Sequence, residues 1–187
     1  GRLVLTLSFT KEMSTWVKPF WYTTADLLTS PTPLAEKWLV SYSSSTGFVG
    51  KISPPVDYID LFLGRTGGCI GETCAVAIIL GGIFLLMTRV ISPAVPLTFI
   101  GTLALLTAVS GGDPLYHVLS GGLLFGAFFM ATDYVTSPVT TKGKVIFGIG
   151  CGLITFLIRT FGAYPEGVSF AILLMNLLTP YIDRLTR

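Results

Sequence analysis

Long apolar runs separated by short polar breaks occupy the chain after residue 69. Each run is near the lower end of the roughly 17 to 25 residues that a helix needs to cross a bilayer. The breaks between them are rich in Gly, Pro and Asp, which is typical of turns. Lipid offers the backbone no hydrogen-bond partner, so helices are the expected form of these runs. The runs are residues 70–87, 93–109, 115–131, 145–161 and 168–182.

The first 69 residues are more polar, and they hold six of the twelve basic and five of the ten acidic residues. Two regions are therefore predicted, an extramembrane region at 1–69 and a helical bundle at 70–187. The opening stretch GRLVLTLSF is too short to cross a membrane alone, and we expect it to be the end of a preceding helix. The predicted fold is an all-α integral membrane protein with about five transmembrane helices.

The composition supports a membrane protein and argues against other classes. Hydrophobic residues make up 51% of the chain and charged residues 12%, a balance that a water-soluble domain would not tolerate on its surface. The net charge of +2 is small, and without a run of Lys and Arg no nucleic acid partner is expected. The three cysteines lack CxxC spacing, so neither a disulfide framework nor a zinc site is indicated.

Positive charge predicts the orientation, because cytoplasmic loops of membrane proteins carry an excess of Lys and Arg. If the runs alternate across the membrane, the connecting loops fall on two sides. The first side carries basic residues, whereas the loops on the second side hold the acids Asp113 and Glu166. We therefore expect the first side and the C-terminus to be cytoplasmic and residues 11–69 to face outward. The basic residues of the first side are Arg89, Lys142, Lys144, Arg184 and Arg187.

Small residues within the runs predict close helix contacts. The pairs Gly122/Gly126 and Gly148/Gly152 have the GxxxG spacing that lets helix backbones approach closely. Packing inside one bundle is the expected use, and contact with another protein of a complex or with a flat cofactor ring is the alternative.

Three acids at the ends of the runs are candidates for ion handling: Glu72, Asp133 and Asp183. A carboxylate near a membrane costs several kcal/mol unless it is solvated, paired or bound to a cation. Each acid is either a simple boundary residue or part of an ion path, and the sequence leaves both open. Glu72 lies within a glycine-rich stretch, 64–73, for which an anion cradle is a further alternative. The single histidine, His117, is expected to be structural.

The segment LLTSPTPLAEKW at 27–38 places Thr32 between two prolines, Pro31 and Pro33. Taken alone, Thr32 is best interpreted as the N-cap of a helix, because Pro33 follows at the first helical position and Glu36 lies in the first turn or so. Turn-forming prolines also hold its hydroxyl outside regular structure.

Four stretches together resemble a known family of membrane proteins, the NqrB/RnfD family. Its members are the D-type membrane component of the Rnf electron-transport complex and a sister protein, the B-type component of the sodium-pumping NADH:quinone oxidoreductase. The resemblance covers nearly all of the chain and about the C-terminal half of a family member, and TSPVTTKG is closer to the Rnf protein. The stretches are DLLTSPTPL at 26–34, DLFLGRTGGCIGETCAVAIILGG at 60–82, FGAFFMATDYVTSPVTTKG at 125–143 and YPEGVSFAILLMNLLTPYID at 164–183.

This resemblance implies that FMN is joined covalently, through its phosphate, to the hydroxyl of Thr32 by an FMN transferase that uses FAD. Asp26, Thr29 and Ser30 fall on the other positions of the family's attachment motif, and Pro33 follows the modified residue. A second flavin, such as riboflavin, is left open.

The implied function is electron transfer in a complex that links reduced ferredoxin with NAD and moves Na⁺ or H⁺ outward. The implied partners are the other membrane and peripheral subunits of the complex, the FMN transferase and membrane lipid. The implied location is a bacterial or archaeal plasma membrane. The rival interpretations are a component of a quinone reductase, a flavin-independent secondary transporter, and a structural membrane anchor for the other subunits.

Overall fold

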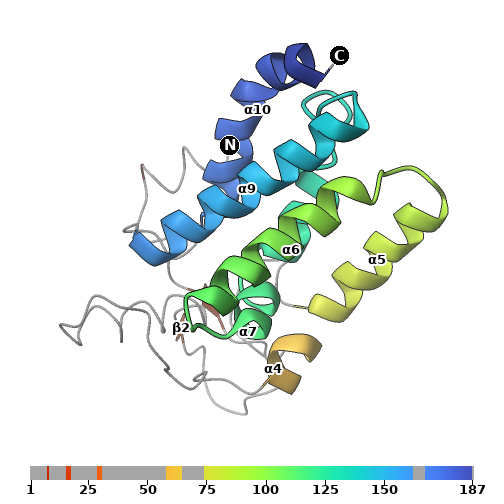
Figure 1. Ribbon diagram of the computed structural model, residues 1–187. Coiled ribbons are helices and arrows are strands. Elements are labelled where there is room, and N and C mark those ends of the chain that lie inside the picture. Colours follow the sequence, from red (N-terminus) through yellow and green to blue (C-terminus); the bar gives the residue numbers. More distant parts are fainter. Residues whose placement is uncertain are drawn as a thin grey trace.

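The computed structural model describes a helical protein (Figure 1). The residues that the structure describes are 8, 16–17, 29–30, 58–64, 74–161 and 167–186. The described elements are one short pair of strands and a series of helices. The elements are β1 (Trp16–Val17), β2 (Thr29–Ser30), α4 (Tyr58–Leu63), α5 (Ala75–Met87), α6 (Ala94–Val109), α7 (Pro114–Leu119), α8 (Leu123–Phe125), the π-helix η2 (Gly126–Met130), α9 (Thr141–Phe161) and α10 (Val168–Thr186).

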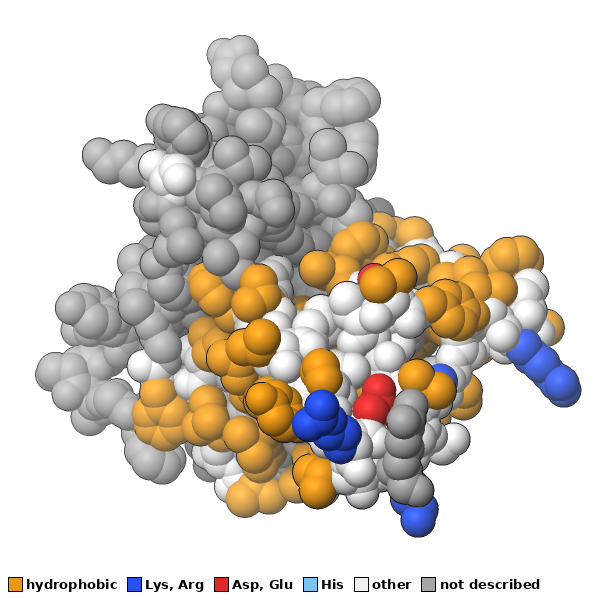
Figure 2. All heavy atoms as spheres, turned by 90° about the horizontal axis from the view of Figure 1, so that it is seen from above, with side chains coloured by type: hydrophobic (Ala, Val, Ile, Leu, Met, Phe, Trp, Pro, Cys, Tyr) orange, Lys and Arg blue, Asp and Glu red, His pale blue; other side chains and the backbone are white. Residues whose placement is uncertain are grey.

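Two of the described helices, α9 and α10, are long and apolar enough to cross a membrane, and α5 and α6 are shorter apolar helices. Only 33% and 28% of the most apolar windows of α9 and α10 are buried inside the protein. The core helix of a water-soluble protein would be covered to a much larger extent. Figure 2 shows apolar side chains over much of the described part of one face, interrupted by a few Lys and Arg side chains. This surface suits a lipid environment.

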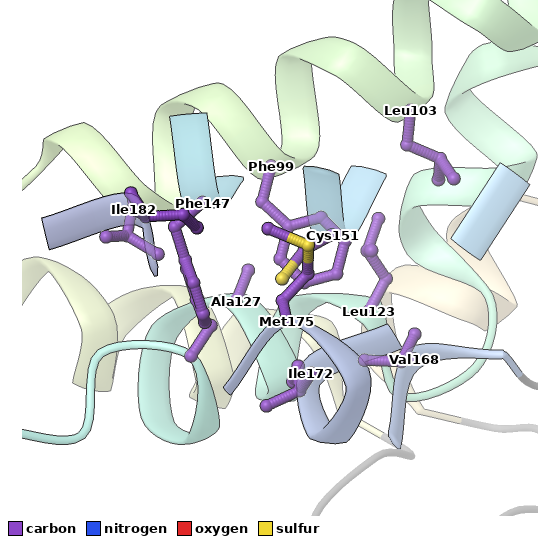
Figure 3. Close-up of a cluster of buried hydrophobic side chains, with 12 residues drawn as sticks. Phe99, Leu103, Leu123, Ala127, Phe147, Cys151, Val168, Ile172, Met175 and Ile182 are labelled. Atoms are coloured by element: carbon purple, nitrogen blue, oxygen red, sulfur yellow. The ribbon is translucent and has the colours of Figure 1, made fainter. Parts of the chain in front are cut away.

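The core lies between α6, α9 and α10. Phe99 of α6 and Cys151 of α9 are 0% exposed, and Met175 of α10 is 5% exposed. Figure 3 shows these three side chains converging in the middle of the cluster, with Leu123 and Ala127 approaching from the segment that carries α8 and η2. The broken segment is therefore packed into the centre of the bundle.

Glycines bring α6 and α9 together. A Cβ atom added to Gly152 would lie 2.7 Å from the Cβ of Thr102 and 3.0 Å from the carbonyl oxygen of Phe99. One added to Gly148, a turn earlier, would overlap the side chain of Thr98. This GxxxG face is thus covered by α6 of the same chain, which confirms the expected packing inside one bundle.

The continuous helix predicted at 115–131 is wrong. The structure ends α7 at Leu119 and begins α8 at Leu123, and the chain continues as η2. Gly121, between them, has a φ of 71°, which lies in the left-handed region that glycine adopts without steric penalty. Ser120 is extended, with φ −89° and ψ 142°, so a single helix cannot pass through these residues. Apolar residues continue through this segment, but the helical conformation of the backbone does not.

The expectation of a helical fold is confirmed for the described residues, and one short pair of strands accompanies the helices. Trp16–Val17 and Thr29–Ser30 form an antiparallel pair in which Trp16 lies opposite Ser30 and Val17 opposite Thr29. Trp, Val and Thr favour extended structure, which gives a local reason for the pair. Helices dominate the rest of the described chain.

Candidate functional site

The predicted flavin attachment motif is only partly within the described residues. Thr29 and Ser30 form β2 and pair with β1, so this part of the motif is held in an extended conformation. Asp26, Thr32 and Pro33 lie outside the described residues. The N-cap and flavinylation interpretations of Thr32 both stay predictions.

Asp183, one of the candidate ion-handling acids, lies in the last turn of α10 and holds the loop that precedes α9. Its Oδ1 accepts a hydrogen bond from the backbone N–H of Val139 at 3.1 Å. One turn earlier, the hydroxyl of Thr179 donates to the carbonyl of Thr136 at 3.0 Å. The side chain of Asp183 therefore stabilises the position of the loop before α9.

A threonine pair continues this row of contacts. The hydroxyl oxygens of Thr140 and Thr186 are 2.6 Å apart. Thr140 also accepts a hydrogen bond from the N–H of Gly143 at 3.0 Å, which is the geometry of an N-cap. The loop 133–140 is thus fastened to α10 at Thr136, Val139 and Thr140, and we call this group of contacts the loop latch.

Asp133, the second candidate acid, lies exposed at the start of the same loop. Its side chain makes no hydrogen bond to a described residue, but its carbonyl accepts one from the N–H of Ser137 at 3.0 Å. The next residue, Tyr134, donates from its hydroxyl to the carbonyl of Val90, beside Arg89. Asp133 and Asp183 therefore belong to one end of the bundle, which we call the acid end.

The third candidate acid, Glu72, lies outside the described residues, as does most of the glycine-rich stretch that contains it. Within the described part of the chain, no group of three or more His, Cys, Asp and Glu side chains could hold a metal ion.

At the other end of the bundle, the polar contacts gather around the C-terminus of α7. His117 is 8% exposed, and its ring meets that of Tyr116 edge-on with centroids 6.0 Å apart. This is the environment of a packed histidine, in agreement with the structural role predicted for it. Arg159, also 8% exposed, donates from Nη1 to the carbonyl oxygen of His117 at 2.6 Å.

The loop before α7 is fastened to α4. The hydroxyl of Tyr58 donates to Oδ2 of Asp113. This hydrogen bond, with smaller contributions from burial and from the carboxylate charge, raises the pKa of Tyr58 above its usual 10.0. Asp113, which the sequence marks only as an outer-loop acid, thus helps to position α4 on the bundle.

The apolar pattern does not single out Arg159 as a site residue, although it places a charge near the end of a run. A basic residue in the last turn of a helix is ordinarily explained by the helix dipole. Here the guanidinium instead points to the carbonyls of another helix. The signal that could have found it is the charge itself, because an ionisable side chain inside an apolar span is rare without a function or a partner.

Comparison with known proteins shows which family the chain belongs to. Its full length, residues 1–187, matches the family described as NQR2, RnfD, RnfE. One relative is the D-type component of the Na⁺-translocating ferredoxin:NAD⁺ oxidoreductase complex of Acetobacterium woodii. It is 46% identical over 164 residues, which are 87% of this chain and 48% of the relative.

Two further relatives are also D-type components of ion-translocating oxidoreductase complexes. The D-type component of the proton-translocating ferredoxin:NAD⁺ oxidoreductase complex of Clostridium ljungdahlii is 43% identical over 197 aligned residues, covering 100% of this chain and 58% of the relative. The D-type component of an ion-translocating oxidoreductase complex of Stutzerimonas stutzeri is 49% identical over 133 residues, or 67% of this chain and 38% of the relative. The chain thus spans about half the length of the relatives it matches. The match across every residue places the chain in the NQR2, RnfD, RnfE family.

Proposed function

We propose that this chain is part of the D-type membrane component of an Rnf complex, which couples electron transfer between ferredoxin and NAD⁺ to the movement of Na⁺ or H⁺. The observation that carries the proposal is the 46% and 43% identity to proteins whose names state this reaction. Both relatives are named as parts of a complex, so we expect the chain to act with the other membrane and peripheral subunits and not alone.

The cofactor we propose is FMN, bound covalently to Thr32 after transfer by an FMN transferase. FMN, when bound, supplies the redox chemistry. The chain supplies the attachment hydroxyl and the recognition residues Asp26, Thr29 and Ser30. The antiparallel pairing of Thr29 and Ser30 with β1 supports an extended conformation for that part of the motif.

The experiment is the mass and fluorescence of the denatured protein, because a phosphodiester survives denaturation and a noncovalent flavin does not. Protein made together with the transferase should show a fluorescent band after denaturing electrophoresis. Thr32→Ala should abolish the band, whereas Thr24→Ala should leave it unchanged. A fluorescent Thr32→Ala band, or flavin mapped to another threonine, would remove the assignment.

For ion movement, we propose that the acid end is the side from which the cation enters. Asp133 is exposed there, and Asp183 lies in the same region. The Lys and Arg residues beside this end support a cytoplasmic position for it. Glu72 stays a candidate for the opposite side.

The rival function is a flavin-independent secondary transporter. The break between α7 and α8 favours it, because discontinuous helices are common in transporter binding sites. The rival predicts no covalent chromophore, and the electrophoresis experiment therefore separates the two functions.

A further inference from the structure

The sequence pattern D-x-x-T-S-P occurs twice in the chain. The first copy, at 26–31, belongs to the proposed attachment motif, and the second copy, at 133–138, lies in the loop before α9. The copies differ at the position that follows the proline, which is Thr32 in the first copy and Val139 in the second. The second copy therefore carries the recognition residues of the proposed motif but no hydroxyl at its final position.

The two copies have different backbone conformations. Thr29 and Ser30 of the first copy are extended and pair with β1. In the second copy, the N–H of Ser137 donates a hydrogen bond to the carbonyl of Asp133 at 3.0 Å, which closes an α-turn. The same residue types are thus held in two conformations, and the second copy lacks the extended form of the first.

The loop latch holds the second copy against α10. The carbonyl of Thr136 accepts a hydrogen bond from the hydroxyl of Thr179 at 3.0 Å, and the N–H of Val139 donates one to Asp183 at 3.1 Å. A modifying enzyme must draw its target segment into its own active site. Each hydrogen bond that holds the segment lowers the fraction of molecules in which the segment is free to be bound. The loop latch therefore weakens recognition of the second copy.

Thr140, directly after Val139, has a hydroxyl, but this group is engaged in other contacts. Its Oγ1 lies 2.6 Å from that of Thr186 and accepts a hydrogen bond from the N–H of Gly143 at 3.0 Å. The side chain of Val139, by contrast, is 82% exposed. Position 139 is therefore the place in the second copy where a hydroxyl would be accessible, and valine does not provide one.

We propose that Val139 and the loop latch exclude the second copy from FMN transfer, so that the transferase modifies the chain at Thr32 alone. The proposal rests on the proposed flavin attachment, whose specificity it explains. In that reaction the threonine oxygen forms a bond to the phosphorus of the FMN half of FAD, and the bond from this phosphorus to the oxygen that bridges the two phosphates breaks. AMP leaves with the bridging oxygen, and the hydroxyl proton is released to solvent. A valine side chain has no oxygen with which to form the new bond.

The test is FMN transfer to the full chain, made without the transferase and solubilised in detergent, so that both sides of the protein are open to the enzyme. Transferase and FAD are then added, and flavin is measured by fluorescence after denaturing electrophoresis and mapped by mass spectrometry. In a Thr32→Ala background, Val139→Thr should restore a fluorescent band, with the flavin at residue 139. Val135→Thr is the control, because Val135 is 88% exposed in the same loop but is not at the final position of the motif. The control protein should stay non-fluorescent.

A second pair of variants measures the contribution of the loop latch. Added to Thr32→Ala/Val139→Thr, Asp183→Ala removes the acceptor for the N–H of residue 139 and should raise the initial rate of transfer about fivefold, the change that corresponds to loss of one hydrogen bond. Asp183→Asn keeps an acceptor oxygen and should leave the rate unchanged.

Three results would overturn the proposal: flavin on Thr140 in the Thr32→Ala protein, no flavin at residue 139 in any Val139→Thr protein, or equal rates with Asp183→Ala and Asp183→Asn. The chain with Thr32 intact is the reference in each experiment. If it takes up no flavin, the proposed attachment itself fails. If it takes up flavin at Thr32 and the Val139→Thr proteins take up none, only the inference about the second copy fails.

Discussion

Asp183 Oδ1 accepts a hydrogen bond from the backbone N–H of Val139 at 3.1 Å, across 44 positions of sequence. The contact fixes the loop before α9 to the end of α10. It gives Asp183 a structural role beside the ion-handling role that the sequence suggests. The two roles respond differently to substitution, so they can be measured separately.

Asp183→Asn keeps an acceptor oxygen for Val139 and removes the charge, whereas Asp183→Ala removes both. We expect Asp183→Ala to lower the free energy of unfolding by about 1 kcal/mol and Asp183→Asn to change it little, as measured by thermal unfolding. If Asp183 also handles the ion, Asp183→Asn should slow Na⁺-dependent pumping despite normal stability. Pumping at the unmodified rate across low and high Na⁺ and across pH would leave Asp183 with the structural role alone.

Asp133→Asn is the matched control, since Asp133 is exposed and its side chain makes no hydrogen bond to a described residue. We expect no change in stability for this variant. Any fall in its rate of ion uptake therefore reports on charge, and a fall larger than that of Asp113→Asn would support entry of the ion at the acid end.

Gly152 determines how closely α6 and α9 pack. Gly152→Ala would place a methyl group 3.0 Å from the backbone oxygen of Phe99, which cannot move aside as a flexible side chain would. The expected loss of stability is about 1 to 3 kcal/mol. Gly101→Ala is the control, because a Cβ atom at this exposed position in α6 meets nothing within 4 Å. That variant should be more stable by up to about 1 kcal/mol, and equal behaviour of the two variants would contradict the packing account.

The apolar pattern predicted the positions of the long helices well. The runs 93–109 and 168–182 correspond to α6 and α10, and 145–161 to α9. The observed α9 begins four residues earlier, at Thr141, because a cap formed by Thr140 starts the helix before its apolar part does. Hydropathy reports where a helix is apolar and not where its backbone hydrogen bonds begin.

The polar contacts at the two ends of the bundle were harder to predict from the sequence. The charge of Asp183 can be read from the sequence. Its hydrogen-bond partner cannot, because it is the backbone N–H of Val139, which only the fold brings near. The break at Ser120 to Gly122 was hidden because its flanks are apolar on both sides, and the close pair Gly122/Gly126 suggested a packing face. The extended backbone of Ser120 and the positive φ of Gly121 show that the helix stops there.

Tyr58 predicts a dependence of stability on pH. Its hydrogen bond to Asp113 raises its pKa above 10.0 in the folded protein, so the folded state favours the protonated phenol. The contribution is therefore complete below pH 10 and is lost as the pH rises through the raised pKa. Tyr58→Phe should lower the melting temperature slightly at pH 8, and the difference from the unmodified protein should vanish at strongly alkaline pH. Tyr181→Phe, at an exposed position, should show no difference at pH 8.

The orientation can be tested by cysteine labelling of intact cells, in a background where the native cysteines are replaced by Ala. An impermeant thiol reagent should label Ser45→Cys, in the outward region, and should not label Lys142→Cys at the acid end. Lys142→Cys should react after the membrane is opened, which shows that the thiol is accessible. The opposite pattern in intact cells would reverse the orientation, and with it the side from which the ion enters.

Arg89 ends α5 in a conformation that suits glycine better. Its φ is 54°, and two hydrogen bonds close the turn, from Arg89 N–H to the carbonyl of Leu86 at 3.1 Å and from Val90 N–H to that of Leu85 at 3.0 Å. This is the Schellman arrangement, in which the left-handed residue is usually glycine.

A non-glycine residue in this region costs roughly 1 kcal/mol or more. Arg89→Gly should therefore be more stable than Arg89→Ala by about 1 kcal/mol, since both lack the charge and only the alanine keeps the strained Cβ. The charge of Arg89 complements the negative end of α5, and in the predicted orientation it adds to the cytoplasmic positive charge. Both variants should accordingly show a larger fraction of wrongly oriented molecules than the unmodified protein in the labelling assay, and to the same extent. A difference in orientation between Arg89→Gly and Arg89→Ala, or equal melting temperatures, would show that backbone conformation and charge are not separable at this turn.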